Sequence, residues 1–348
     1  MHIPSVVAIV GSGMQAASTA YFLRALSPNL KITVFEASSK HIAPHASSKG
    51  GGFLARDWGG GGATDEFHRR SFALHEELAE KLSISSYRKN IRVLSVQPGN
   101  KLAKGKDLPD YLNGKIGGAT VMEDEADGGT AQVHPADYCS KVLEASGAEV
   151  KLGATVSGFE FGDSDDSDDY HIEGVKYVDA ESGETKTFAC DTTVICNGPW
   201  ATMAEDWFAE TSGIRFPMEG IKSASMSFAS DGVDGVALFT GEDNRFSTHL
   251  EVYPRPNGDV YLCGIGGSDY VPADELRHGA YLHECEPRPE RIQKGKEAFW
   301  LMSSKFNGVE PDVTQACMRP CPQDGLPVVC AVPNVRGAYI NAGHNCWG

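Results

Sequence analysis

Short apolar runs alternate with amphipathic segments along this chain, and their spacing predicts its elements. Residues 6–10 are continuously apolar and residues 31–35 and 192–196 are mainly apolar or β-branched, which is typical of parallel strands covered on both faces. Between the first two runs we expect a helix, so the chain begins with a strand–helix–strand unit. A later group of runs predicts strands of an antiparallel sheet at 223–228, 236–239, 248–253 and 260–263.

The remaining pattern predicts further helices and strands. Helices are expected at 64–82, 136–146, 273–284 and 287–304. His134 and Pro135 mark the entry of the second of these helices, and Gly147 marks its end. Further strands are expected at 87–96, 149–152, 155–161, 171–178 and 185–188, with a polar connection near 99–118 and a last strand after Gly337.

The turn after the first strand carries candidate chemistry. Gly11 permits a tight turn, Gly13 lets the backbone approach a pyrophosphate, and the small Ala16 lets the helix pack against the strand. The N-terminus of that helix directs its N–H groups and positive dipole end at phosphates. Glu36 ends the second strand, where a carboxylate accepts bonds from ribose hydroxyls and disfavours a 2′-phosphate. The order predicts a site for FAD or NAD, and the alternative is a glycine turn in an ordinary strand–helix–strand unit.

Charge and composition exclude several classes of function. The net charge of −16 argues against an exposed nucleic-acid surface and against docking on anionic membranes. No apolar run approaches the roughly 20 residues of a membrane-spanning helix. The nine cysteines show neither CxxC nor metal-ligand spacing, which predicts reduced thiols, a cytoplasmic location and no metal site. The acidic run 163–169 lacks the glycine and the closing glutamate of a calcium loop, so we expect a solvated hairpin loop.

Five patches follow one another in order along the chain. They are residues 11–36, 46–54, 132–135, 194–200, and 318–327 leading into 343–344. Together they resemble the FAD-dependent D-amino-acid oxidase/glycine oxidase family over essentially the whole chain. Within that family, the end of the chain is similar to a eukaryotic branch whose flavin strand ends in Gly-His-(Asn/Ser)-Cys-Trp-Gly. The resemblance implies FAD as cofactor and an α/β fold, with an FAD/NAD(P)-binding Rossmann-like domain and an interleaved mixed α+β substrate domain.

The resemblance also implies a division into domains and a set of residues that meet the flavin. The FAD-binding domain would be discontinuous, from residues 1–60, 130–200 and 310–348, and the substrate domain would comprise 61–129 and 201–309. The cofactor-binding residues implied by the resemblance belong to six parts of the site: the pyrophosphate turn, the ribose carboxylate, the second flavin loop, the adenine contact, the turn closing over the pyrophosphate and the turn beneath the flavin ring. They are Gly11, Gly13, Met14, Gln15, Glu36, Ala37, Ser47, Ser48, Gly51, Gly52, Phe53, Val156, Asn197, Gly198, Trp200, Gly343 and His344.

Two side chains are candidates for the chemistry. In family members the Arg of an Arg-Pro motif binds the substrate carboxylate, and Arg319 matches it, since a guanidinium fork suits that bidentate task. The alternative is a structural arginine at a strand end. Tyr253 shares one strand face with His249 and Glu251, and in relatives this strand lines the substrate site. Tyr253 would cover the substrate or hydrogen-bond it, and core packing is the alternative.

The implied activity is hydride transfer to FAD from the C–N bond of an amino acid or secondary amine, with oxygen or another electron acceptor reoxidising the flavin. One alternative is a 2-hydroxy acid substrate, and another is a flavin-binding interaction or trafficking protein with little turnover. Covalent attachment through Cys317, as in some sarcosine-oxidase-like relatives, is the alternative to non-covalent flavin. Family members continue past this point into a helix facing the flavin, whereas this sequence ends at Gly348, so we expect it to be truncated.

Overall fold

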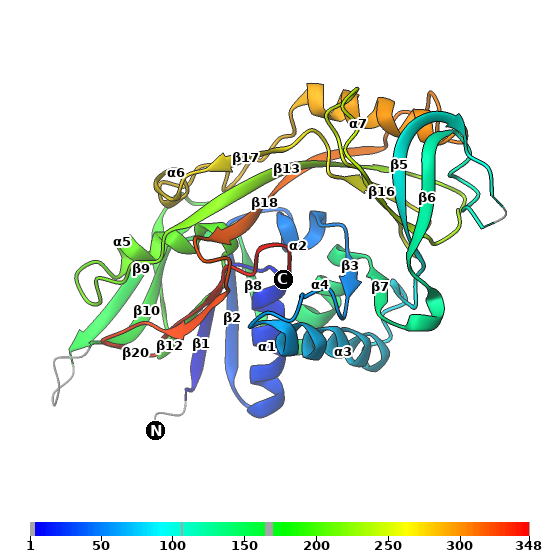
Figure 1. Ribbon diagram of the computed structural model, residues 1–348. Helices are drawn as coiled ribbons and strands as arrows, with labels where there is room; N and C mark the ends of the chain where they lie inside the picture. Colours follow the sequence, from blue (N-terminus) through cyan, green and yellow to red (C-terminus); the bar gives the residue numbers. More distant parts are fainter. Residues whose placement is uncertain (1–3, 106, 164–169, 348) are drawn as a thin grey trace.

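A six-stranded sheet lies at the centre of the protein, and the computed structural model describes residues 4–105, 107–163 and 170–347 (Figure 1). Its strands pair in parallel, except that the edge strand β19 runs antiparallel to β21. The strand order is β19 (Val328–Ala331), β21 (Ala338–Ala342), β12 (Thr192–Ile195), β1 (Val6–Val10), β2 (Lys31–Glu36) and β8 (Glu149–Leu152). The three predicted parallel strands are therefore confirmed as neighbours, with β1 between β2 and β12.

Helices cover one face of this sheet (Figure 1). They are α1 (Met14–Leu26), α3 (Asp65–Lys81) and α4 (Pro135–Ser146). Ala16, Ala17 and Ala20 on α1 are fully buried, so their small side chains let the helix lie close to the strands.

The ends of α4 follow the predicted signals. The Nδ1 atom of His134 accepts a hydrogen bond from the N–H of Asp137 at 3.3 Å, which caps the first turn. Gly147 follows the last turn with a φ of 62°, a left-handed conformation that glycine adopts at little cost. His134 is therefore a helix-entry residue, as predicted.

A second layer of strands covers the other face of the parallel sheet. It consists of β9 (Ala154–Asp163), β10 (Tyr170–Asp179), β11 (Thr185–Ala189) and β20 (Val335–Arg336). Phe208 is fully buried in the core between the layers, where its ring stacks on Phe159 at 5.1 Å and meets Phe161 edge-on at 5.7 Å. The acidic run expected to form a hairpin loop lies outside the described residues beyond Asp163.

An eight-stranded mixed sheet arches over the parallel sheet (Figure 1). Its path is β17 (Ser268–Val271), β13 (Met218–Phe228), β16 (Val260–Cys263), β15 (Glu251–Pro254), β14 (Ala237–Thr240), β5 (Val93–Leu102) and β6 (Lys115–Glu123), and β18 (Val313–Pro322) also pairs with β13. The predicted helix at 287–304 is α7 (Pro289–Met302), which packs on the outer face of this sheet through Ala298 and Phe299. The inner face is left to enclose a site.

Short elements join these layers. A three-stranded sheet holds β3 (Phe53–Ala55), β7 (Thr130–Val133) and β4 (Tyr87–Lys89). The short helices are α2 (Ala46–Lys49), α5 (Ala204–Trp207) and α6 (Ala273–Arg277), and the 3₁₀ turns are η1 (Glu125–Asp127), η2 (Gly198–Met203) and η3 (Asn345–Trp347).

The expected helix at 273–284 is wrong beyond its first turns. α6 ends at Arg277, and the backbone then takes left-handed conformations at Gly279 (φ 81°) and Tyr281 (φ 60°). A right-handed helix cannot continue through such residues. Gly279 is a helix stop that the apolar spacing obscured.

The expected strand at 87–96 is two strands. Asn90 has a φ of 56°, and the turn there sends β4 and β5 into different sheets. Both ends of the expected polar connection at 99–118 are strand, because β5 continues to Leu102 and β6 begins at Lys115 and pairs with it. β5 carries polar, exposed side chains toward its end, so it left no apolar signal there. In the same sheet, β15 begins at Glu251 rather than at residue 248, and β17 and β18 were not anticipated.

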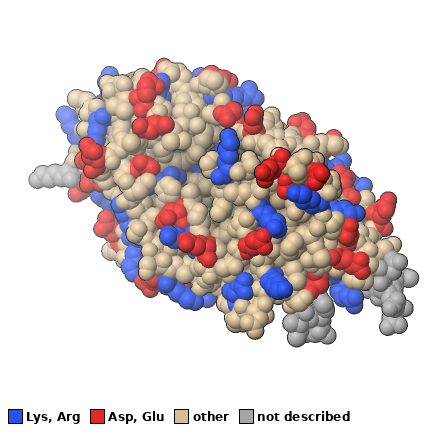
Figure 2. Space-filling view, turned by 180° about the vertical axis from the view of Figure 1, so that it is seen from behind, with Lys and Arg blue, Asp and Glu red and all other residues tan. Residues whose placement is uncertain are grey.

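The surface mixes both signs of charge. Figure 2 shows basic and acidic side chains interspersed over the face opposite to the view of Figure 1. Across the described residues, no helix combines the length and apolar character that crossing a membrane requires. β18 joins the eight-stranded sheet although it falls in the segment expected for flavin binding, and the division into two domains stays a prediction.

The stacked aromatic core behind the parallel sheet yields a prediction about stability. Phe208→Ala should lower the free energy of unfolding by about 3–5 kcal/mol, because a fully buried ring is lost and a cavity is left. Urea denaturation of the apoprotein measures this change. Leu26→Ala is the matched control, because Leu26 is 84% exposed and its replacement should change stability by less than about 0.5 kcal/mol. Equal effects of the two substitutions would contradict the packing described.

Candidate active site

A cavity of about 620 Å³ lies between the carboxyl ends of the parallel strands and the inner face of the eight-stranded sheet. Every site residue predicted from the sequence lines it except Ser48. The hydroxyl of Ser48 instead donates to the carbonyl of His45 at 3.3 Å, within α2 and its cap. The fold thus gathers residues from Gly11 to His344 around one space, at the edge where ligands bind in open α/β sheets.

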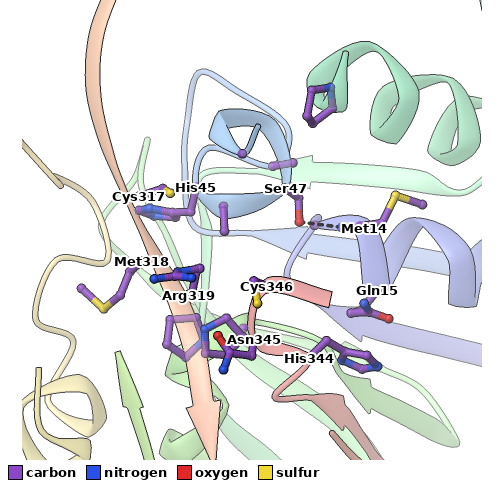
Figure 3. Close-up of a pocket in the computed structure, with 18 of the residues that line it drawn as sticks. Met14, Gln15, His45, Ser47, Cys317, Met318, Arg319, His344, Asn345 and Cys346 are labelled. Atoms are coloured by element: carbon purple, nitrogen blue, oxygen red, sulfur yellow. Dashed lines mark hydrogen bonds between the residues drawn. The ribbon is translucent and has the colours of Figure 1, made fainter. Parts of the chain in front are cut away.

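Two glycines at one end of the cavity leave no room for side chains. Gly11 has a φ of 90°, and a Cβ there would lie 2.8 Å from the Cα of Asn197. A Cβ on Gly13 would lie 2.9 Å from the Oγ of Ser47, which accepts a hydrogen bond from the N–H of Met14 at 2.9 Å (Figure 3). Since Gly13 has no side chain over the first turn of α1, the positive end of that helix opens on the cavity.

Glu36 lies at the same end of the cavity and is 7% exposed. Burial raises the pKa of its carboxyl group, against the effect of several hydrogen bonds. Oε2 accepts from the N–H and the hydroxyl of Ser12, and Oε1 accepts from the N–H of Ser38 at 2.9 Å. These donors fix the carboxylate on the cavity wall, where a ribose hydroxyl can donate to it.

Arg319 lies on β18 at the other end of the cavity. Its Nε is buried and meets no acceptor among the described residues. Figure 3 shows its side chain over the turn that carries Asn345 and Cys346, and its charge lowers the pKa of the Cys346 thiol against the larger effect of burial. No carboxylate of residues 4–105, 107–163 and 170–347 forms an ion pair with Arg319. A guanidinium without a carboxylate of its own is suited to bind one from a ligand.

Glu251 on β15 brings a negative charge to the cavity wall. Its Oε2 accepts from the hydroxyl of Tyr253 at 2.6 Å and from the thiol of Cys263 at 3.3 Å. Its Oε1 meets no donor in the described part of the chain. Burial raises the pKa of Tyr253 and of Cys263 well above the usual ranges, so both groups stay protonated donors. The alternation along this strand placed Glu251 and Tyr253 on one face, and the structure adds that the tyrosine hydroxyl is committed to Glu251.

Arg319 and Glu251 act on the same two thiols. The pKa of Cys346 is raised by burial, lowered by Arg319 and raised by Glu251, and both charges act on Cys263 as well. Within the described residues, the carboxylate, ammonium and guanidinium groups on the cavity wall are these two and Glu36. The end of the cavity opposite Glu36 therefore offers one cation and one anion to a ligand.

Buried neutral groups complete the wall. Burial lowers the pKa of His45 and of His344 to about 4, so both imidazoles are uncharged at neutral pH. The Nε2 of His45 donates to the carbonyl of Leu282 at 2.9 Å, and its ring lies 4.4 Å from that of Trp200. No sequence motif marks His45, which directly precedes α2. Burial also raises the pKa of Cys317 to about 11, so its thiol is protonated at neutral pH.

The residues present fit a flavin dinucleotide. Gly11 and Gly13 with the open start of α1 suit a pyrophosphate, and the fixed carboxylate of Glu36 suits a ribose. Toward the other end, the buried Nδ1 of His344 and Nε of Arg319 meet no partner among the described residues. Unpartnered buried polar atoms on a cavity wall mark places that a ligand completes.

Comparison with known proteins agrees with this geometry. Residues 7–348 match the DAO family, described as FAD dependent oxidoreductase. The chain is 24% identical, over 98% of its length and 89% of the other protein, to a Schizosaccharomyces pombe protein named "Putative oxidoreductase C1F5.03c".

Solved structures share the fold at lower identity. A glycine oxidase from Bacillus cereus superposes with a TM-score of 0.71 and 19% identity, covering 98% of this chain and 91% of that one. An L-proline dehydrogenase from P. horikoshii superposes with a TM-score of 0.71 and 15% identity, covering 100% of this chain and 90% of that one. The match over nearly the whole chain, together with the glycine turn and the cavity, shows that this protein belongs to the DAO family of FAD-dependent oxidoreductases.

Proposed function

We propose that the enzyme oxidises the C–N bond of a small amino acid or secondary amine that carries a carboxylate. The observation that carries this proposal is that Arg319 and Glu251 line the same cavity and that both charges act on the thiols of Cys263 and Cys346. The similar solved structures are named for glycine and L-proline, which supports an amino acid as substrate. The roles of the predicted flavin-contacting residues are part of the same proposal.

Arg319 binds the substrate carboxylate in this proposal. Its guanidinium has no carboxylate partner among the described residues, so it is free to form a bidentate pair. Such a pair fixes the orientation of the neighbouring carbon, and positioning supplies much of the rate enhancement in hydride transfer.

Glu251 binds the amine. An ammonium group must lose a proton before the nitrogen can support loss of hydride from its carbon, and the free Oε1 can accept that proton. Tyr253 is a positioning residue here, because its hydroxyl and the thiol of Cys263 hold the other oxygen. FAD, when bound, supplies the acceptor for the hydride.

A 2-hydroxy acid is the second candidate, because Arg319 alone suits any small carboxylate. Glu251 favours the amine, since an amine offers a carboxylate both charge and N–H donors, whereas a neutral hydroxyl offers one donor. We further propose that oxygen or another acceptor reoxidises the flavin, that the flavin is held without a covalent bond, and that the enzyme is cytoplasmic. The protonated Cys317 thiol supports a flavin held without a covalent bond. The nine free cysteines support a cytoplasmic location.

Anaerobic mixing of the FAD-loaded enzyme with D-amino, L-amino, N-methyl amino and 2-hydroxy acids tests the proposal through loss of flavin absorbance. Arg319→Ala should raise the KM of any active carboxylate substrate about 100-fold, since losing a charged bidentate contact costs about 2–3 kcal/mol. Flavin content should stay unchanged, and loss of flavin from this variant would assign Arg319 a structural role. Arg215→Ala is the matched control, because that exposed arginine pairs with Glu205 away from the cavity.

Glu251→Gln should slow flavin reduction by the amine substrate at least tenfold and shift its pH profile, because the amide cannot take up the amine proton. Any reduction by a 2-hydroxy acid should change less than twofold. Tyr253→Phe should have a smaller effect of the same kind, and Glu210→Gln, on the exposed surface, should have none. If 2-hydroxy acids reduce the wild-type flavin and no amine does, the substrate proposal is wrong.

A further inference from the structure

The backbone carbonyls of the loop of residues 49–52 accept hydrogen bonds from donors outside the loop. Each of the four consecutive carbonyls accepts a hydrogen bond from another segment of the chain. The donors are the Tyr261 hydroxyl at 2.8 Å and the Gln315 amide at 3.3 Å on Lys49, Arg255 Nη2 at 2.7 Å on Gly50, the Gln132 amide at 2.8 Å on Gly51, and the Val133 N–H at 2.9 Å on Gly52.

This arrangement decides where the N–H groups of the loop point. In a trans peptide the N–H lies opposite the carbonyl of the same unit. The N–H of Gly51 therefore points away from Arg255, and the N–H of Gly52 points away from Gln132. Neither N–H meets an acceptor among the described residues, and both glycines line the cavity. The loop thus presents two free donors to a ligand.

The loop lies close to the proposed reaction end. A Cβ on Gly51 would come within 2.6 Å of the Tyr253 ring, and Tyr253 is the residue that holds Glu251. Gly52 has a φ of 76°, and a Cβ there would collide with the carbonyl of Val133. Glycine is required at both positions, so a ligand meets bare backbone here.

Arg255 supplies a buried positive charge behind this loop. Its residue is 6% exposed, and its guanidinium lies 4.4 Å over the ring of Tyr261. It forms no ion pair with any carboxylate of the described residues, and its Nε has no acceptor there. Asp259 acts on this guanidinium without forming an ion pair with it, and a ring face and one carbonyl supply its direct contacts, so the cost of burying the cation is only partly offset. A ligand that gains negative charge on the other side of the loop would offset the remaining cost of burying the Arg255 charge.

We propose that Arg255 is a positioning and electrostatic residue for the flavin. It holds the Gly50 carbonyl so that the Gly51 N–H group faces the isoalloxazine ring, as Gln132 does for the Gly52 N–H group, and its charge favours the ring after hydride transfer. A hydride brings two electrons and one proton, so the ring gains one negative charge. The inference rests on the proposed function in one respect, namely that the flavin ring lies between this loop and Arg319.

Arg255→Met tests the proposal without any substrate. We expect the Kd for FAD, measured by titrating the apoprotein, to rise at least tenfold. The midpoint potential of bound flavin should fall by about 30 mV, which is a tenfold loss of preference for the reduced form in a two-electron couple. Arg255→Lys keeps the charge and should recover most of the potential but less of the affinity. Arg245→Met, which removes an exposed arginine paired with Asp243, should change neither quantity.

Two outcomes would overturn the proposal. One is an Arg255→Met protein whose FAD affinity and flavin potential equal those of Arg245→Met. The other is a less stable apoprotein whose bound flavin keeps the wild-type potential, which would leave Arg255 a structural role. If Arg255→Met does not fold, Tyr261→Phe keeps the ring and the charge but removes the donor to Lys49. It should raise the Kd for FAD several-fold at unchanged potential, and unchanged affinity would contradict the role given to the hydrogen bonds on the carbonyls of residues 49–52. None of these results depends on which substrate the enzyme oxidises.

Discussion

The close approach of bare backbone segments is the constraint on which the rest of this structure depends. Gly11 crosses the chain at Asn197, Gly13 lies against Ser47, and Gly51 lies under the ring of Tyr253. Each contact brings a strand end or loop to a distance that a Cβ would prevent. Glycine makes the unfolded chain more flexible, and the layers on both sides of the parallel sheet offset that cost through burial. The cavity exists because these contacts hold its walls in place.

Few charges remain inside a chain whose surface is rich in them. The net charge is −16, yet the cavity wall carries three formally charged side chains among the described residues. Burial keeps His45 and His344 uncharged at neutral pH, so Arg319 and Glu251 determine the electrostatics at one end of the space. In a site of low dielectric, each unpaired charge acts more strongly on a ligand than it would in water. Arg255 extends this principle to a charge placed behind a loop instead of on the wall.

Elements with a buried apolar face were predictable, and elements without one were not. The strands β1, β2 and β12 are buried on both faces, so their composition alone identified them. The hairpin of β5 and β6 is held by backbone pairing and exposes many of its side chains, which is why the sequence pattern resembled a loop. Backbone conformation produced the other errors, since Asn90 and Gly279 end elements through left-handed φ angles that apolar periodicity does not report.

The sequence by itself determined the glycine turn, the acidic residue after the second strand, the arginine before a proline and the family they indicate, because these signals are local. Only the tertiary structure decided which side chains share one space. Glu251 on β15 shares one cavity wall with Arg319 on β18, although these strands are distant in the chain. The hydrogen bond from Arg255 to the Gly50 carbonyl joins residues 205 positions apart. Hydrogen bonds and burial act between atoms in space, whereas a single sequence records only spacing along the backbone.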